Sequence, residues 1–156
     1  MMRTEFEVSE LQRRLDNLVM IGVVEEADYP AQRIRVRIGA LLTGWLPWTT
    51  LRAGLDRTWW APEIGEQVLV LSRSGDPALG VVMGAIYRDA HPAPADRETV
   101  SRTVRPDGTV EEYDRTTGAY MLDVTAAGKI VLRCGASSIE IANAGVRIMA
   151  PRIDLN

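Results

Sequence analysis

The amino-acid sequence predicts a mainly β protein in three parts: a short N-terminal helix, a small barrel, and a β-structure that is intertwined with other copies. Strict alternation of charged and apolar residues at 32–38 indicates a strand with one dry face. From Gly108 to Asn156 a similar alternation recurs in short segments separated by glycines. Strands this short, each apolar on one face, cannot form a core alone and need a neighbouring copy. Structures of this kind are usually mechanical rather than catalytic.

The N-terminal segment, residues 1–18, is predicted to contain an amphipathic helix over residues 5–18. Ser9 and Gln12 have the spacing of a capping box, in which each side chain satisfies an exposed amide of the first turn. Leu11, Leu15 and Leu18 then share one face of the helix. Because one such helix is marginally stable alone, its apolar face must pack against something, and a neighbouring subunit is one candidate.

Residues 19–90 are predicted to form a compact β-domain. The segment after its second strand is rich in tryptophan and proline and is too irregular for regular sheet. About five strands without a helical period favour a small closed barrel of the OB type. The main predicted strands are 20–25, 32–38, 67–71 and 80–87, with a turn at 74–77.

A linker at residues 91–98 separates the barrel from the β-tail, residues 99–156, and its prolines keep it extended. Strands are predicted at 99–104 and 110–116 around a hairpin turn, and the repetitive region follows. The alternating apolar residues of that region are Tyr120, Leu122, Val124, Ile130, Leu132, Cys134, Ile139, Ile141, Val146, Ile148, Ala150, Ile153 and Leu155.

Composition and charge argue against several classes of protein. The formal net charge of -3 disfavours a dedicated nucleic-acid binder, which usually carries a basic surplus. The single cysteine, Cys134, excludes an intrachain disulfide framework. The N-terminus has no basic region followed by an apolar run, and no segment approaches the ~18 consecutive apolar residues of a membrane-spanning helix. We therefore expect a chain that is made in the cytosol and does not use the general secretory route.

Five residues could support chemistry, and for each the sequence favours a structural role. His91 has no second ligand nearby and is predicted to be a solvated linker residue. Cys134 occupies an apolar position, so its side chain is predicted to be buried and packed rather than to act as a nucleophile. Glu63, Glu66 and Asp76 have the residue types of a glycosidase pair, but their position in turns favours conformational roles. No catalytic, cofactor-binding or metal-binding residue is predicted.

Two groups of side chains in the barrel leave several interpretations open. The arginines of the second strand form a phosphate-binding track, the polar face of an edge strand, or a charged surface against a partner; they are Arg33, Arg35 and Arg37. The tryptophans form a stacking platform for bases or sugars, or pack the barrel and a subunit interface, as their proline-rich context favours. They are Trp45, Trp48, Trp59 and Trp60.

The sequence resembles the baseplate assembly protein V family, the central spikes of contractile phage tails. The resemblance rests on the run from Gly65 to Leu71, on Gly75-Asp76, on the run from Gly80 to Tyr87, and on the tryptophans at 48 and 59–60. A barrel, a short linker and a self-pairing β-tail follow in the family's order over nearly the whole chain. The spike of an R-type pyocin, a headless tail that kills bacteria, is also compatible, and the two alternatives stay open.

The resemblance implies a homotrimer in which residues 99–156 form an intertwined triple-stranded β-helix, the needle, with backbone groups paired between chains. The barrel would dock to the tail hub or tube-end protein, and sheath contraction would drive the needle through the target's outer membrane, without enzymatic activity. The particle would assemble in the bacterial cytoplasm and then be released as a virion or bacteriocin. The trimer core would contain Ile130, Leu132, Ile139, Ile141, Val146 and Ile148.

Family members often end in an apex where His-x-His motifs from three chains bind an iron. This sequence has only His91, so no metal ligand and no cofactor are expected, and either the apex is absent or a separate tip protein caps the needle. The alternative function is an OB-type module that binds oligonucleotides or glycans, with the β-tail serving oligomerisation. For the spike itself no nucleic-acid partner is expected.

Overall fold

The computed structural model describes residues 2–125 and 127–154, which separate into one unit ending at Pro92 and a second beginning at Ala93. The division lies inside the predicted linker. Met1 of the predicted helical segment, and Leu155 and Asn156 of the β-tail, lie outside the described residues.

Helix α1 (Met2–Asp16) begins well before the predicted capping box. Ser9 lies inside the helix, where its hydroxyl donates a 2.9 Å hydrogen bond to the carbonyl oxygen of Glu5, one turn earlier. The capping-box prediction was therefore wrong: no proline or glycine precedes Ser9, so the helix continues through it. Glu10 forms ion pairs with Arg13 at 2.8 Å and Arg14 at 2.7 Å, which lower the pKa of its carboxyl to about 2.

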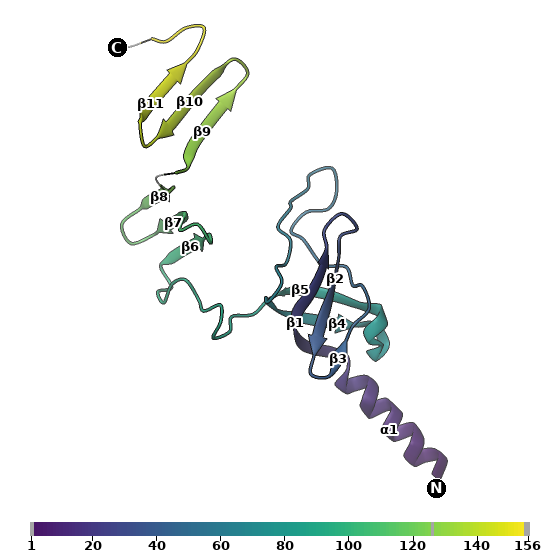
Figure 1. The fold of residues 1–156 in the computed structure, drawn as a ribbon. Coiled ribbons are helices and arrows are strands. Elements are labelled where there is room, and N and C mark those ends of the chain that lie inside the picture. The colour runs from purple at the N-terminus through teal and green to yellow at the C-terminus, as the bar shows by residue number, and fades with distance from the viewer. Residues whose placement is uncertain (1, 126, 155–156) are drawn as a thin grey trace. The chain divides into compact units, whose positions relative to one another are not determined.

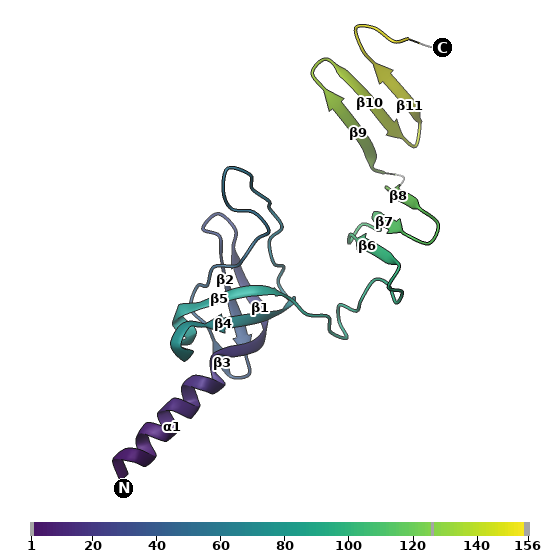
Figure 2. The same ribbon diagram turned by 180° about the vertical axis from the view of Figure 1, so that it is seen from behind.

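The first unit contains a five-stranded antiparallel sheet in the order β3-β2-β1-β4-β5 (Figures 1 and 2). Its strands are β1 (Val19–Asp28), β2 (Arg33–Ile38), β3 (Leu41–Leu42), β4 (Gln67–Ser72) and β5 (Gly80–Ala85). Two single-turn 3-10 helices, η1 (Arg73–Gly75) and η2 (Pro77–Leu79), form the predicted turn between β4 and β5. Strand β5 ends at Ala85, before the predicted limit at Tyr87, and Arg88 and His91 exchange two backbone hydrogen bonds farther along the chain.

Residues 46–49, in the tryptophan- and proline-rich segment, close the sheet into a barrel. On one side Leu46 exchanges two backbone hydrogen bonds with Ile34 of β2, at 2.8 and 3.0 Å. On the other side the Thr49 amide donates to Val82 of β5, and the Val82 amide donates to Pro47, both at 2.9 Å. A short segment with only these two bridges thus joins β2 to β5, which confirms the predicted closed barrel.

The barrel core is small and aliphatic. The alternation in β2 is as predicted, because Ile34 and Val36 are fully buried while the intervening arginines lie on the outer face. Every hydrophobic side chain that is buried in the described residues belongs to this core: Val24, Ile34, Val36, Leu46, Val68, Val70 and Val82.

Gly22 of β1 is where the barrel tolerates no side chain. A Cβ there would lie 2.5 Å from Cγ1 of Val36 and 2.7 Å from the Arg37 carbonyl oxygen. We expect Gly22→Ala to lower the free energy of unfolding by about 1–3 kcal/mol, because strand β2 must shift to admit the methyl group. Urea unfolding followed by tryptophan fluorescence measures this loss.

Gly44→Ala is the matched control, because a Cβ at Gly44 meets nothing within 4 Å. Its expected change is within about 0.5 kcal/mol. Equal midpoints for the two variants would contradict the close approach at Gly22.

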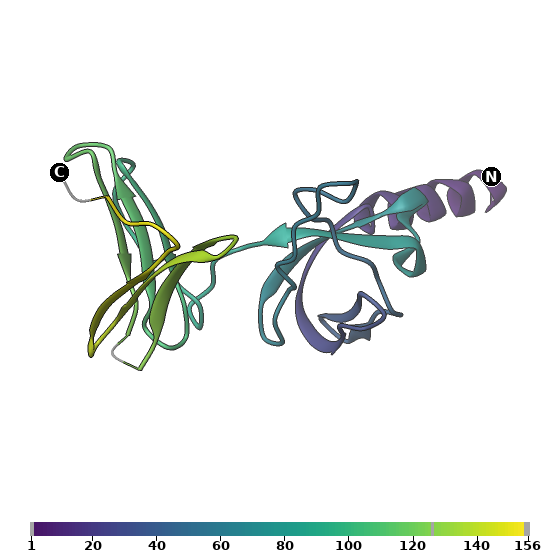
Figure 3. The same cartoon turned by 90° about the horizontal axis from the view of Figure 1, so that it is seen from above.

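The second unit consists of two three-stranded antiparallel meanders (Figure 3). The first contains β6 (Val100–Val104), β7 (Val110–Asp114) and β8 (Ala119–Asp123). The second contains β9 (Lys129–Cys134), β10 (Ser137–Ala142) and β11 (Gly145–Met149). These strands hydrogen-bond to neighbours in the same chain, and the pairing of backbone groups between chains stays a prediction. In the second meander two-residue turns make this intrachain pairing possible: Gly135, at φ +55°, lets β9 turn straight back into β10.

Candidate functional site

The β9–β10–β11 sheet places the six predicted core residues on one face. The register pairs Ile139 with both Leu132 and Ile148, and pairs Ile141 with both Ile130 and Val146. Side chains directly opposite each other in a sheet point to the same side, so the six residues form two parallel apolar rows. Ile130 is half-buried, and the exposed fractions of the other five run from 39% for Ile139 to 65% for Val146. We call these six side chains the needle face.

The opposite face of this sheet is mixed and partly charged. Lys129 and Glu140 form a 3.2 Å ion pair across β9 and β10, and Arg147 lies opposite Glu140 in register. Val131 and Met149 interrupt the polar character of this face. The two faces therefore differ in chemistry as the alternation in the sequence requires.

Cys134 lies on the needle-face side, opposite Ser137, but it is exposed in the single chain. The prediction that it is buried is thus not met within the chain. The physical reason is that this whole side of the sheet lacks a covering layer among the residues that the structure describes.

The first meander carries a tyrosine-rich face. Tyr113 pairs with Tyr120, and Glu111 pairs with Leu122, on the same side of β7 and β8. The Tyr120 hydroxyl donates a hydrogen bond to the Glu111 carboxylate, which raises the pKa of the tyrosine. Tyr120 and Leu122 share one face, as the alternation predicts, and both are exposed.

On the other face of this meander and in its turns, charged side chains form ion pairs and hydrogen bonds. Arg102 forms an ion pair with Glu112 across β6 and β7. Asp107 accepts hydrogen bonds from the Thr109 amide, at 2.9 Å, and from its hydroxyl, at 3.1 Å, which lower the pKa of the aspartate. Such contacts hold turns in shape and offer no reactive group.

The three arginines on the outer face of β2 have partners within the barrel. Arg37 makes two hydrogen bonds of 2.6 Å to Glu25, and they lower the pKa of that carboxyl. Arg35 pairs with Glu26 at 3.0 Å, donates to the Thr43 carbonyl, and lies 5.8 Å from the ring centroid of Trp45. Arg33 donates to the neighbouring Gln32 carbonyl at 2.9 Å. A phosphate backbone would have to compete with Glu25 and Glu26, so this geometry does not favour the phosphate-binding track.

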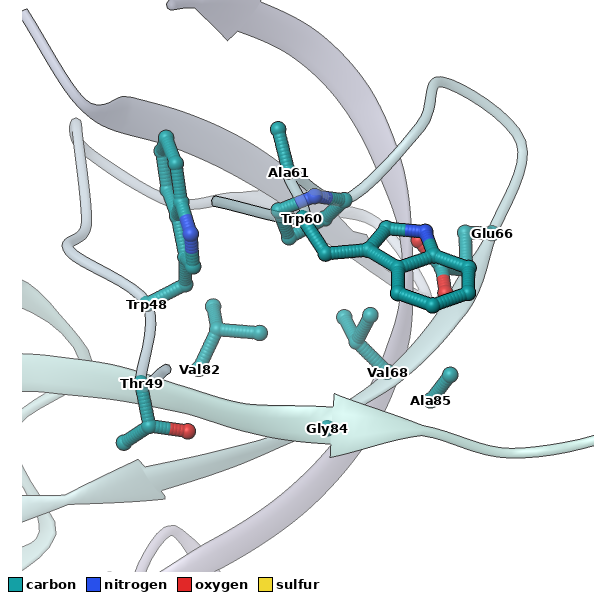
Figure 4. Close-up of a pocket in the computed structure, with 10 residues that line it drawn as sticks. Trp48, Thr49, Trp60, Ala61, Glu66, Val68, Val82, Gly84 and Ala85 are labelled. Carbon is teal, nitrogen blue, oxygen red and sulfur yellow. The ribbon is translucent and has the colours of Figure 1, made fainter. Parts of the chain in front are cut away.

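The tryptophans lie on the closing segment and on the loop that follows it. Trp48 packs on the barrel core and meets Trp59 edge-on, with ring centroids 5.8 Å apart and planes at 67°. A pocket of about 250 Å³ lies between the indoles of Trp48 and Trp60 (Figure 4). Val68 and Val82 also line it, and Glu66 lies beside Trp60. Trp45, Trp59 and Trp60 remain exposed in the single chain, so their role as an interface or a stacking platform stays a prediction.

The sequence did not signal the loop that carries Trp59. Residues 50–58 form a narrow hairpin in which the Thr58 amide donates to Arg52 and Ala53 pairs with Arg57. Leu51 and Leu55 on it are almost completely exposed. Because apolar and polar residues do not alternate here, no strand pattern indicated the hairpin.

Two of the three carboxylates that resemble a glycosidase pair, Glu66 and Asp76, accept hydrogen bonds from backbone amides. Glu66 accepts a 2.9 Å hydrogen bond from the Glu63 amide, and Asp76 accepts one from the Ala78 amide at the start of η2. His91 is exposed, as predicted.

The described residues contain neither a cluster of metal ligands nor a membrane-spanning helix. In residues 2–125 and 127–154, no group of three or more His, Cys, Asp or Glu side chains is arranged to hold a metal ion. No helix in the same ranges has the length and hydropathy to span a membrane. The expectation of no cofactor stays a prediction.

Comparison with known proteins gives a family and a relative. Residues 20–87 match the type VI secretion system/phage-baseplate injector OB domain, which corresponds to the closed barrel described above. The chain is 39% identical over 135 residues to the spike protein of Escherichia phage P2, an alignment that covers 83% of this chain and 64% of that protein. The chain thus spans less than two thirds of its relative's length. Together with a barrel and a β-tail in the order that the sequence indicated, these similarities support the phage baseplate spike family.

Proposed function

We propose that the chain is the central spike of a contractile tail, that it works as a homotrimer, and that sheath contraction drives it through the outer membrane of the target cell. The barrel docks to the tail hub or tube-end protein, and the two meanders build the needle. The similarity to the phage P2 spike protein and the injector OB domain support this role.

The needle face is the observation that carries the proposal. Its aliphatic side chains lie side by side on one sheet and have no covering layer in the described part of the chain. Each such side chain contributes roughly 1.5–3 kcal/mol when it moves from water into an apolar environment. Three copies arranged around a common axis bury these faces against one another. The intertwined triple-stranded β-helix is then assembled from meanders rather than from single strands.

A mechanical role explains why the chain needs stiffness and no chemistry. The work of penetration comes from the sheath, so the spike only has to remain folded under load. Glu66 and Asp76 hold backbone amides rather than facing each other across a substrate site. We accordingly propose no enzymatic activity and no cofactor. The spike is assembled in the bacterial cytoplasm and released with the virion or bacteriocin.

A split-luciferase experiment tests this function. The small complementing peptide is fused after residue 156 in tail particles, and target cells express the large luciferase fragment in the periplasm. Luminescence is expected only after contraction, because only then does the needle cross the outer membrane. Contraction-blocked particles, and cells with the fragment in the cytoplasm, are the controls. Particles that kill cells without a periplasmic signal would contradict the piercing role.

A further inference from the structure

Helix α1 carries a narrow apolar seam that the function above does not use. Val8, Leu11, Leu15 and Leu18 follow one another at spacings of three, four and three residues, with Leu18 just beyond the helix. This is the a–d alternation of a heptad repeat, with Val8 and Leu15 at a and Leu11 and Leu18 at d. Their exposed fractions run from 36% for Leu18 to 65% for Leu15. We call these four side chains the helix seam.

The width of the helix seam indicates what kind of surface covers it. The flanking e and g positions hold Glu5, Glu7, Gln12 and Arg14, all of them polar, and the exposed Phe6 lies at an f position, away from the seam. A helix that lies on a sheet or in a globular core usually has an additional apolar row at e or g. A stripe confined to a and d is instead typical of a helix that pairs with other helices of the same kind.

The barrel holds only the C-terminal end of the helix. At Gly75, where φ is +70°, a Cβ would lie 2.2 Å from the Arg14 carbonyl oxygen, so the absence of a side chain lets the helix end pack against η1. The Ser72 amide donates a 2.9 Å hydrogen bond to the Leu18 carbonyl, which fixes the exit of the chain into β1. The rest of α1 extends from the barrel (Figures 1 and 2). A free helix of 15 residues is marginal in water, so the exposed seam needs a partner.

We propose that the α1 helices of three copies of this chain form a parallel, in-register coiled coil through the helix seam. The inference rests on the proposed trimer, because two heptads alone are too short for a stable coiled coil. Attachment to a common trimer raises the effective concentration of the three helices into the millimolar range, which compensates for the short seam. Three-fold symmetry makes all helices leave their barrels in the same direction, which gives the parallel orientation.

Site-directed crosslinking in the full-length protein tests the coiled coil. Cys134→Ser removes the native thiol, and Leu11→Cys then places one thiol per chain at a d position. A short bifunctional thiol reagent is expected to join chains, and a denaturing gel shows the covalent dimer. Ser9→Cys is the matched control: it is on the same helix two residues away, at a b position that faces outward, and it changes only one side-chain atom.

The expected result is strong crosslinking through Leu11→Cys and little through Ser9→Cys, with equal helix content by circular dichroism. Leu15→Cys, at an a position, provides a second and independent reading. A trimer by sedimentation with equal or absent crosslinking at the two positions would overturn the coiled coil while leaving the spike function intact. A monomer by sedimentation would overturn the proposed trimer and the coiled coil together.

Discussion

Replacing Ile141 by aspartate is expected to abolish assembly of the proposed trimer. Ile141 lies in the middle of the needle face, paired in register with Ile130 on one side and Val146 on the other. In the trimer the substitution would bring three carboxylates into an apolar core. An ionised group without a partner in such a place costs several kcal/mol, and the cost is incurred once per chain. Sedimentation of the purified protein should show the mass of one chain instead of three.

Ser138→Asp is the control for this experiment. Ser138 belongs to the same strand but lies on the opposite face, in register with Arg133. A carboxylate there meets a cation and water rather than a dry core, so the trimer should persist. If Ser138→Asp dissociated the trimer and Ile141→Asp did not, the faces of β10 would be reversed relative to the assembly.

Replacing Leu46 by alanine is expected to lower the free energy of unfolding of the barrel by about 2–5 kcal/mol. Leu46 is 1% exposed, and its backbone forms half of the bridge that closes the barrel onto β2. Truncation removes buried methyl groups at the closing segment and leaves a cavity that the surrounding valines fill only in part. Urea unfolding followed by tryptophan fluorescence reports on this unit directly, because all four tryptophans of the chain belong to it.

Leu51→Ala provides the comparison within the same stretch of chain. This leucine is 90% exposed, so removing its methyl groups should change the stability by less than about 0.5 kcal/mol. The sedimentation of both variants should still show a trimer, because the needle face is untouched. A loss at Leu51 as large as at Leu46 would mean that the hairpin at 50–58 is buried in the assembly.

The barrel was predictable because the alternation of polar and apolar residues in its strands matches which side chains are buried. In strands with one buried face, such as β2, polar and apolar residues alternate in the sequence. The buried valines and Ile34 occupy the apolar positions of that alternation. The closing segment was not predictable as a strand, because Pro47 has no amide to donate to a hydrogen-bond ladder and only residues 46–49 pair. The capping box failed for a different reason, since a short motif that marks a helix start also occurs inside helices.

The candidate site was predictable as a set of residues but not as an arrangement. Alternation with a period of two identified the six side chains of the needle face, and the register of β9, β10 and β11 places them together. The alternation could not reveal which strands pair, because it specifies which face of a strand a residue lies on and not which strand lies beside it. Likewise, the arginines of β2 read as a charged track until Glu25 and Glu26 are seen opposite them.

The sequence by itself determined the division into helix, barrel and β-tail and the apolar face of each strand, because these follow from local periodicity and residue type. The baseplate spike family was indicated separately, by the resemblance of particular runs to known spikes. Only the tertiary structure decided that the tail folds as two meanders, that residues 46–49 close the barrel, and that Arg35 and Arg37 are already paired with glutamates. The physical reason is that hydrogen-bond partners and ion pairs join residues far apart in the chain. The distance between such residues depends on the turns between them and on packing, and no single segment encodes it.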